Sequence, residues 1–294
     1  MIETRYLQYF LAIAREQNIT RAAESLHISQ PTLSKQMMDL EAQLGCQLFI
    51  RSKKRIELTD DGMYFRARAQ EMLDLMNKTE STLHRSSSNV SGDIFLGCGE
   101  TYALDFITSI YRAMLNEYPD VKMNLYSGDA DSVLEQLDKG LLDFGLLLSP
   151  RMLDKYDYTA LNKHDTFGLL MPKDSPLAAQ STVSIEELYN LPILMSRQTW
   201  TGNHPIDWKG LDYQKLKIAA TFNLIYNATF MVEQGIGYAL CLDKLVAESE
   251  ARNLTFRPIT PQLRMELYFV TKKYQTFSPA AKLFINKLNA AINC

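Results

Sequence analysis

The chain contains few of the residues and motifs that mark enzymes, metalloproteins and disulfide-stabilised proteins. Its four cysteines and four histidines are widely separated and form no C-x-x-C pair or other metal-ligand spacing. The sequence also has no Walker lysine motif, no G-x-S-x-G and no H-E-x-x-H. We therefore expect a protein that is not an enzyme and that binds no metal and no cofactor.

A secretion signal and long apolar runs are absent as well. The first ten residues, MIETRYLQYF, contain no basic segment that leads into an apolar run. The longest apolar stretches, such as FNLIYNATFMVEQGIGYALCL, are interrupted by polar residues and glycine, so none is expected to span a bilayer. We expect a cytoplasmic protein whose cysteines are small buried side chains.

Positive charge is scarce overall but unevenly distributed. The net charge of −3 and the isoelectric point near 5.9 argue, by themselves, against a nucleic-acid partner. However, residues 1–58 carry eight Lys and Arg against six Asp and Glu, whereas residues 93–294 carry nineteen against twenty-three. The N-terminal excess has the sign expected of a segment that meets phosphate.

The first 59 residues have the pattern of a winged helix-turn-helix domain. Apolar residues recur on one face of a first helix, Thr20 can cap a second, and Ser29 can cap a third with Pro31 in its first turn. The third helix has an apolar stripe at Leu33, Met37, Leu40 and Leu44. Gly45 ends it, and CQLFIRSKKRIELTD is then typical of two short strands joined by a basic tip. We therefore predict an all-α domain with a small β wing over 1–59.

Residues 60–86 are predicted to form a long linker helix, which Thr59 can cap. Its apolar residues alternate steps of four and three, as in a coiled-coil seam. This helix either packs on its own chain or pairs with a second copy, and the polar residues on its other faces favour the second copy. The predicted dimerisation residues are Phe65, Ala69, Met72, Met76, Thr79 and Leu83. Residues 87–92, rich in serine, are a predicted hinge.

Beyond the hinge, strand-like and helical segments alternate, which is typical of parallel sheets with crossover helices. DIFLGC, VKMNLYSG and LDFGLLLS are predicted strands of a first round, and a second round begins near His164. The strand MELYFVTKK and the helix SPAAKLFINKLNAAIN would then complete the first lobe. We predict an α/β domain with lobe I over 93–162 and 264–294 and lobe II over 163–263.

The segment from Phe10 to Gly62 closely resembles the DNA-binding domain of LysR-type transcriptional regulators, and a weaker resemblance continues through the rest of the chain. The shared residues are Phe10, Ala22, Ala23, Leu26, Ser29, Gln30, Pro31, Ser34, Leu40, Glu41, Leu44, Gly45, Leu48, Phe49, Arg51, Leu58, Thr59 and Gly62. The resemblance implies a winged helix-turn-helix, a linker helix and a two-lobed effector domain like a periplasmic binding protein. It also implies a homodimer or homotetramer that regulates transcription, binds a small effector between its lobes and contacts RNA polymerase.

The resemblance also implies how the third helix and the wing meet double-stranded DNA. Thr32, Lys35 and Gln36 would face the major groove of an interrupted palindrome. Family members often carry Arg where this chain has Lys35, and a lysine cannot form the bidentate fork with a base. The predicted DNA-binding residues are Ser29, Gln30, Pro31, Thr32, Ser34, Lys35, Gln36, Arg51, Lys53, Lys54 and Arg55.

The effector cleft implied by the resemblance is rich in hydrogen-bonding groups. Its predicted lining residues are Glu100, Thr101, Tyr102, Ser127, Gly128, Ser196, Arg197, Gln198, Thr199 and Asn223. Hydroxyls, helix N-terminal N–H groups and one guanidinium suit a small carboxylate or other anion, with Thr101, Ser196 and Arg197 as the expected contacts. An inward-pointing Glu100 would instead favour an amine or an amino acid.

Two alternative functions stay open at this point. A periplasmic solute-binding protein has a similar two-lobed domain. The missing secretion signal and the predicted DNA-binding domain at the N-terminus argue against this function. A peroxide-sensing or redox-sensing regulator of the same family would use two cysteines of the effector domain, for which Cys98 and Cys241 are available. Both cysteines lie in apolar strand contexts, which are typical of inert core thiols.

Overall fold

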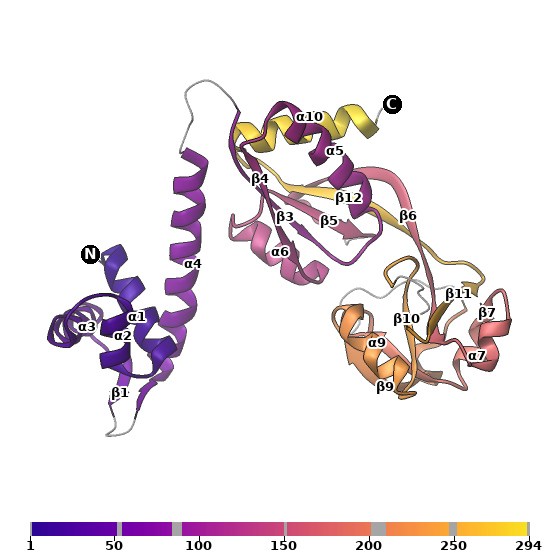
Figure 1. Cartoon of the computed structure of the whole chain (residues 1–294), viewed down its shortest axis with the longest axis horizontal. Coiled ribbons are helices and arrows are strands. Elements are labelled where there is room, and N and C mark those ends of the chain that lie inside the picture. Colours follow the sequence, from indigo (N-terminus) through magenta and orange to yellow (C-terminus); the bar gives the residue numbers. More distant parts are fainter. Residues whose placement is uncertain are drawn as a thin grey trace. The chain divides into compact units, whose positions relative to one another are not determined.

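The computed structural model describes residues 2–51, 55–83, 90–149, 152–200, 210–246 and 252–292. These residues form two compact units, Met1–Leu83 and His84–Cys294 (Figure 1). No helix in the described ranges is both long and apolar enough to cross a membrane.

The N-terminal unit is a winged helix-turn-helix followed by a long helix, as the sequence predicts. Its elements are α1 (Thr4–Glu16), α2 (Ile19–Ser25), α3 (Gln30–Leu44), β1 (Phe49–Arg51), β2 (Ile56–Leu58) and α4 (Asp60–Leu83). Phe10 of α1 lies at the centre of the core, and its ring centroid is 5.1 Å from that of Phe49 and 4.9 Å from that of Phe65. The predicted stripe of α3 is buried in this core at Leu33, Met37 and Leu40.

Helix boundaries in this unit follow from local hydrogen bonds. Ser29 caps α3 by accepting from the backbone N–H of Thr32, and Thr59 caps α4 by accepting from the N–H of Gly62, as predicted. The prediction that Thr20 caps the second helix is wrong, because the side chain of Asn18 accepts the N–H groups of Thr20 and Arg21.

Helix α4 uses part of its apolar seam inside its own unit. Phe65 and Ala69 are buried in the core beside α1. Met72, Met76 and Leu83 are 40%, 37% and 64% exposed, which leaves apolar surface on the later turns of the helix. The first alternative weighed from the sequence, packing within the chain, therefore holds for the early turns of the helix, and pairing of the later turns with a second copy stays a prediction.

The C-terminal unit is an α/β fold with a mixed sheet. Its first elements are β3 (Gly92–Cys98), α5 (Leu104–Glu117), β4 (Val121–Ser127), α6 (Ala130–Asp138), β5 (Phe144–Leu148) and β6 (Tyr156–Pro172). They are followed by η1 (Pro176–Ala179), β7 (Val183–Ser184), α7 (Ile185–Leu188), β8 (Pro192–Ser196), α8 (Arg197–Trp200), η2 (Tyr213–Lys215) and β9 (Lys217–Phe222). The last elements are α9 (Ile225–Glu233), β10 (Tyr238–Leu242), β11 (Leu254–Thr260), β12 (Arg264–Lys272) and α10 (Pro279–Ile292).

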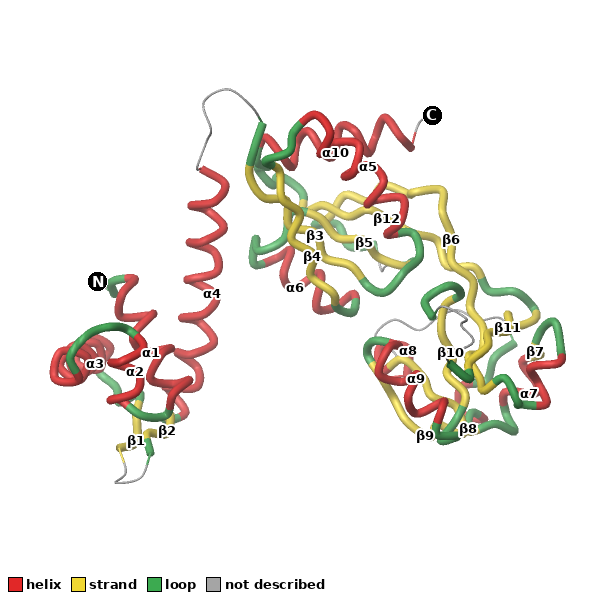
Figure 2. The backbone as a smooth tube through the Cα atoms, in the orientation of Figure 1, coloured by secondary structure: helices red, strands yellow, loops and turns green. Residues whose placement is uncertain are grey.

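The long strand β6 joins two lobes (Figure 2). Its first part pairs with β12 in the sheet of lobe I, which has the order β4-β3-β5-β12-β6. Its last residues pair with β10 and β11 in lobe II, where the order continues as β6-β10-β8-β9. The parallel pairs expected from the alternating pattern are present, but β12 and β10 run antiparallel to β6.

Helices cover both faces of the lobe I sheet (Figure 1). The core on one face contains Ile107 of α5 and Phe284 of α10, as expected if the C-terminal helix completes this lobe. The core on the other face contains Val133 and Leu137 of α6. Because β3 and β4 are parallel and each is followed by a helix, the N-termini of α5 and α6 lie at the same edge of the sheet.

Candidate functional site

The outer surface of α3 presents short polar groups. Ser29, Gln30, Pro31, Thr32 and Lys35 are exposed. The hydroxyl of Ser29 lies 2.7 Å from that of Thr32, so both belong to the helix cap as well as to this surface. Two more predicted contacts are half-buried, namely Ser34 and Gln36.

The wing is described only in part. Arg51 is the last residue of β1 and pairs with Ile56 of β2. Arg55 is exposed, and its guanidinium donates to Glu57 at 2.5 Å. The predicted contacts Lys53 and Lys54 lie outside the residues that the structure describes.

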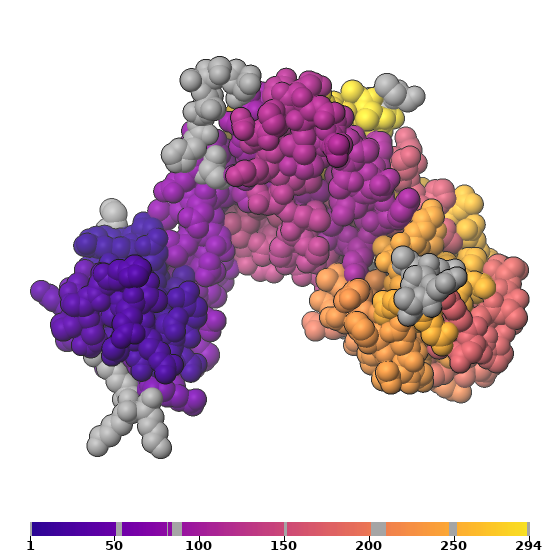
Figure 3. Space-filling model, viewed as in Figure 1, coloured from indigo at the N-terminus to yellow at the C-terminus, as the bar shows by residue number. Residues whose placement is uncertain are grey.

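A cavity of about 550 Å³ lies between the two lobes of the C-terminal unit. In the space-filling view the purple atoms of lobe I touch the orange atoms of lobe II (Figure 3). The polar and charged lining residues are Glu100, Asp129, Ser149, Ser196, Gln198, Thr199, Asn223 and Arg264. Apolar walls come from β5, β6, β10 and β12 through residues such as Leu146, Phe167, Leu240 and Met265.

Six of the ten predicted effector residues line this cavity, and four do not. The six are Glu100, Gly128, Ser196, Gln198, Thr199 and Asn223, whereas Thr101, Tyr102, Ser127 and Arg197 are not among its lining residues. Buried Thr101 donates its hydroxyl hydrogen to Asp165 at 2.5 Å and accepts from the N–H of Ala103. The hydroxyl hydrogen of Thr101 is therefore not available for a bond to a ligand. Tyr102 is half exposed, with the ammonium of Lys244 at 4.9 Å from its ring centroid.

Sequence reasoning missed Asp129, Ser149 and Arg264 as lining residues. Asp129 had a local signal, because it caps α6 by accepting from the N–H of Ser132 at 2.9 Å. Ser149 and Arg264 have no such signal, since only the antiparallel pairing of β5 and β12 brings their strands together. Among the described residues that line the cavity, Arg264 is the only cation.

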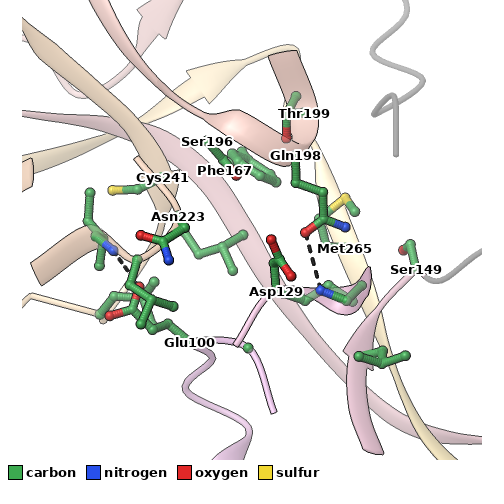
Figure 4. Close-up of a pocket in the computed structure, with 18 of the residues that line it drawn as sticks. Glu100, Asp129, Ser149, Phe167, Ser196, Gln198, Thr199, Asn223, Cys241 and Met265 are labelled. Carbon is green, nitrogen blue, oxygen red and sulfur yellow. Dashed lines mark hydrogen bonds between the residues drawn. The ribbon is translucent and has the colours of Figure 1, made fainter. Parts of the chain in front are cut away.

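Two hydrogen bonds cross the cavity from one lobe to the other (Figure 4). Glu100 of lobe I accepts from the backbone N–H of Ile225, the first residue of α9 in lobe II, at 2.5 Å. Gln198 of lobe II accepts from the N–H of Ala130, the first residue of α6 in lobe I, at 3.3 Å. Each lobe therefore supplies an acceptor to the start of a helix in the other.

The two cysteines of the redox alternative are buried core thiols. Burial, together with the nearby charge of Glu100, raises the pKa of Cys98 to about 11 and that of Cys241 to about 12. Their thiolates are therefore rare at neutral pH, whereas a peroxide-reactive cysteine needs a lowered pKa and access to solvent. Within the described ranges, no group of three or more His, Cys, Asp or Glu could hold a metal ion.

Comparison with known proteins identifies both units. Residues 4–63 match the family model of bacterial regulatory helix-turn-helix proteins of the lysR family, and residues 87–292 match the LysR substrate binding domain. The chain therefore belongs to the LysR family of transcriptional regulators, with an N-terminal helix-turn-helix domain and an effector-binding domain.

Similar proteins cover nearly the whole chain. The uncharacterized HTH-type transcriptional regulator YnfL of Escherichia coli (strain K12) is 28% identical, over 98% of this chain and 99% of its own. The Hca operon transcriptional activator HcaR of the same organism is 27% identical, over 97% and 96%. The crystal structure of CbnR, a LysR family transcriptional regulator, shares the fold with a TM-score of 0.79 at 20% identity, over 99% of both chains.

Proposed function

We propose that this LysR family member acts in the cytoplasm as a sequence-specific DNA-binding regulator controlled by a small carboxylate-bearing metabolite. The observation that carries the proposal is the position of Glu100. Its carboxylate points into the cavity, where a free negative charge would favour an amine, but it already accepts from the N–H of Ile225. The start of α9 can therefore hold a carboxylate there, and an effector carboxylate could take the same position.

The DNA part of the proposal rests on α3. Its exposed polar surface, capped by Ser29, has the size and chemistry of a helix that enters a major groove. CbnR has been solved in complex with its target DNA, and it has the same fold over the whole chain. We propose that α3 contacts base edges of an interrupted palindrome and that the wing contacts the phosphate backbone.

The assembly part of the proposal rests on α4. Its exposed apolar residues Met72, Met76 and Leu83, together with Thr79, would pair with a second copy of the helix. Such a dimer would present two copies of α3 to the two halves of a palindrome. RNA polymerase is the proposed partner at the promoter.

The effector part of the proposal rests on the cavity lining. Ser196, Thr199 and Asn223 offer hydroxyl and amide groups on the side of lobe II, and Arg264 offers a positive charge. The apolar walls suit a hydrocarbon or aromatic body. We propose an effector that joins a carboxylate to such a body.

Three probes with the same apolar body test the carboxylate. Hexanoate, hexanamide and hexylamine are titrated separately into the full-length protein in a calorimeter. The proposal predicts that hexanoate binds more tightly than the other two. Equal affinities would show that the charge is not recognised, and a preference for hexylamine would contradict a carboxylate effector.

A further inference from the structure

The two hydrogen bonds across the cavity differ in the charge of the acceptor and in whether the helix also has a side-chain cap of its own. At the start of α6, Asp129 supplies the local cap, and the amide of Gln198 adds a neutral acceptor from the other lobe. At the start of α9, Leu224 occupies the capping position and provides no side-chain hydrogen bond. The carboxylate of Glu100 thus supplies from lobe I the acceptor that α9 lacks in its own sequence.

The backbone that carries Glu100 is held firmly. Its neighbour Thr101 is buried and bonded to Asp165 on the connecting strand β6. Glu100 itself is only half-buried and lines the cavity, so its side chain can leave α9 while the turn stays in place. The carboxylate is therefore tethered beside the position that the proposed effector would need.

From this geometry we infer that Glu100 is a specificity-determining residue that competes with the effector. Its carboxylate accepts the N–H of Ile225, and an effector carboxylate must displace it to reach α9. Displacement also breaks the hydrogen bond that the N–H of Ile225 donates to the charged Glu100, and it leaves the bond that the N–H of Ala130 donates to the neutral amide of Gln198. This inference rests on the proposed carboxylate effector, and it adds that Glu100 raises the concentration at which the effector binds.

The test removes the negative charge and keeps the shape of the side chain. Full-length wild-type protein and the Glu100→Gln variant are titrated calorimetrically with hexanoate and with hexanamide. The variant should bind hexanoate about tenfold more tightly or better, because like charges in a partly desolvated cavity repel by at least about 1.4 kcal/mol. Hexanamide, which carries no charge, should bind both proteins with similar affinity.

A matched control is available on the surface of lobe I. Glu117→Gln makes the same chemical change at an exposed residue that pairs with Lys287 and does not line the cavity. Its affinity for hexanoate should equal that of the wild type. Glu100→Ser, which removes the carboxylate and shortens the side chain, should also bind hexanoate more tightly than the wild type. This second variant tests the inference if Glu100→Gln does not fold.

The outcomes separate this inference from the proposed function. If hexanoate binds the wild type and gains nothing in either Glu100 variant, the inference is overturned while the carboxylate effector stands. If hexanoate binds none of the proteins, the carboxylate effector itself fails. If hexylamine binds the wild type and is lost in Glu100→Gln, Glu100 is a receptor for a cation, and the inference is overturned.

Discussion

At the scale of single residues, burial separates side chains that are accessible to a ligand from side chains that serve the fold. Lys35 is exposed on α3. It forms no ion pair with another described residue, so no such pair would compete with its contact to DNA. Thr101 looks similar in sequence, yet it is buried and its hydroxyl bonds to Asp165. A polar side chain is therefore more available to a ligand where the fold does not already use its hydrogen-bonding groups.

The first prediction concerns Lys35. Replacement by alanine should weaken binding to the palindrome by about 1–3 kcal/mol and relax its base preference, as expected when a groove contact is lost. Arg55→Ala, on the wing, is the comparison and should weaken binding to specific and random DNA alike. Fluorescence anisotropy with both DNAs measures this, and equal losses for Lys35→Ala would assign Lys35 to phosphate.

The second prediction concerns the buried carboxylate of Asp165, which is 4% exposed. Burial raises its pKa above the ordinary value of 3.8, and the hydrogen bond from Thr101 opposes this increase. The folded protein therefore holds the proton more tightly than the unfolded chain, so this residue contributes stability at acidic pH that is lost as the pH rises through its folded pKa.

Asp165→Asn removes this titration. The free energy of unfolding of the variant, relative to the wild type, should therefore increase between about pH 4 and about pH 7. Urea unfolding at both pH values measures it, with Asp212→Asn at an exposed carboxylate as the control. A constant difference between Asp165→Asn and the wild type would show that Asp165 does not titrate differently on folding.

At the scale of elements, α4 buries one part of its apolar surface in its own unit and leaves another part exposed. Its first turns pack on α1 through Phe65 and Ala69, and its later turns expose Met72, Met76 and Leu83. A heptad pattern shows only that one side of a helix is apolar, and the neighbouring elements decide which turns remain uncovered.

The third prediction concerns this exposed half. Met76→Lys should raise the dissociation constant of self-association at least about tenfold, because burying an unpaired ammonium costs more than about 1.4 kcal/mol. Palindrome binding should weaken in parallel. Met63→Lys, at a residue 56% exposed on another face of α4, is the matched control. Sedimentation of the full-length variants measures assembly, and equal behaviour of the two would contradict the proposed seam.

At the scale of the whole molecule, the C-terminal unit depends on β6, which contributes to both lobes. Near the crossing, Gly168 pairs with Cys241 of β10 on one side and with Pro258 of β11 on the other. An added Cβ at Gly168 would lie 2.4 Å from the carbonyl oxygen of Arg257 and 2.1 Å from the ring of Phe256. No side chain fits there without movement of the strand.

The fourth prediction follows from this close approach. Gly168→Ala should lower the free energy of unfolding by about 1–3 kcal/mol, as expected for overpacking beside backbone. Gly99→Ala makes the same change where the nearest atom would be 3.7 Å away, and it should have little effect on stability. Urea unfolding measures the free energy of unfolding of both variants. Equal values would show that β11 can move away from the added methyl group without loss of stability.

Much of the N-terminal unit was predictable because its signals are local. Ser29, Thr59 and the stripe of α3 act over three to eleven residues, which is the range that helix periodicity and caps can encode. Even here the cap of α2 was misassigned, since Asn18 and Thr20 are both good capping residues and only the backbone conformation selects one.

The sequence by itself determined the order of the elements, the winged helix-turn-helix and the α/β character of the effector-binding domain. Tertiary structure alone decided the cavity, because its contacts join residues far apart in the chain. Glu100 and Ile225 are separated by 125 positions and Ala130 and Gln198 by 68. No local pattern encodes such pairings, since they depend on β6 passing from one lobe to the other and on antiparallel strands bringing Ser149 and Arg264 to the same wall.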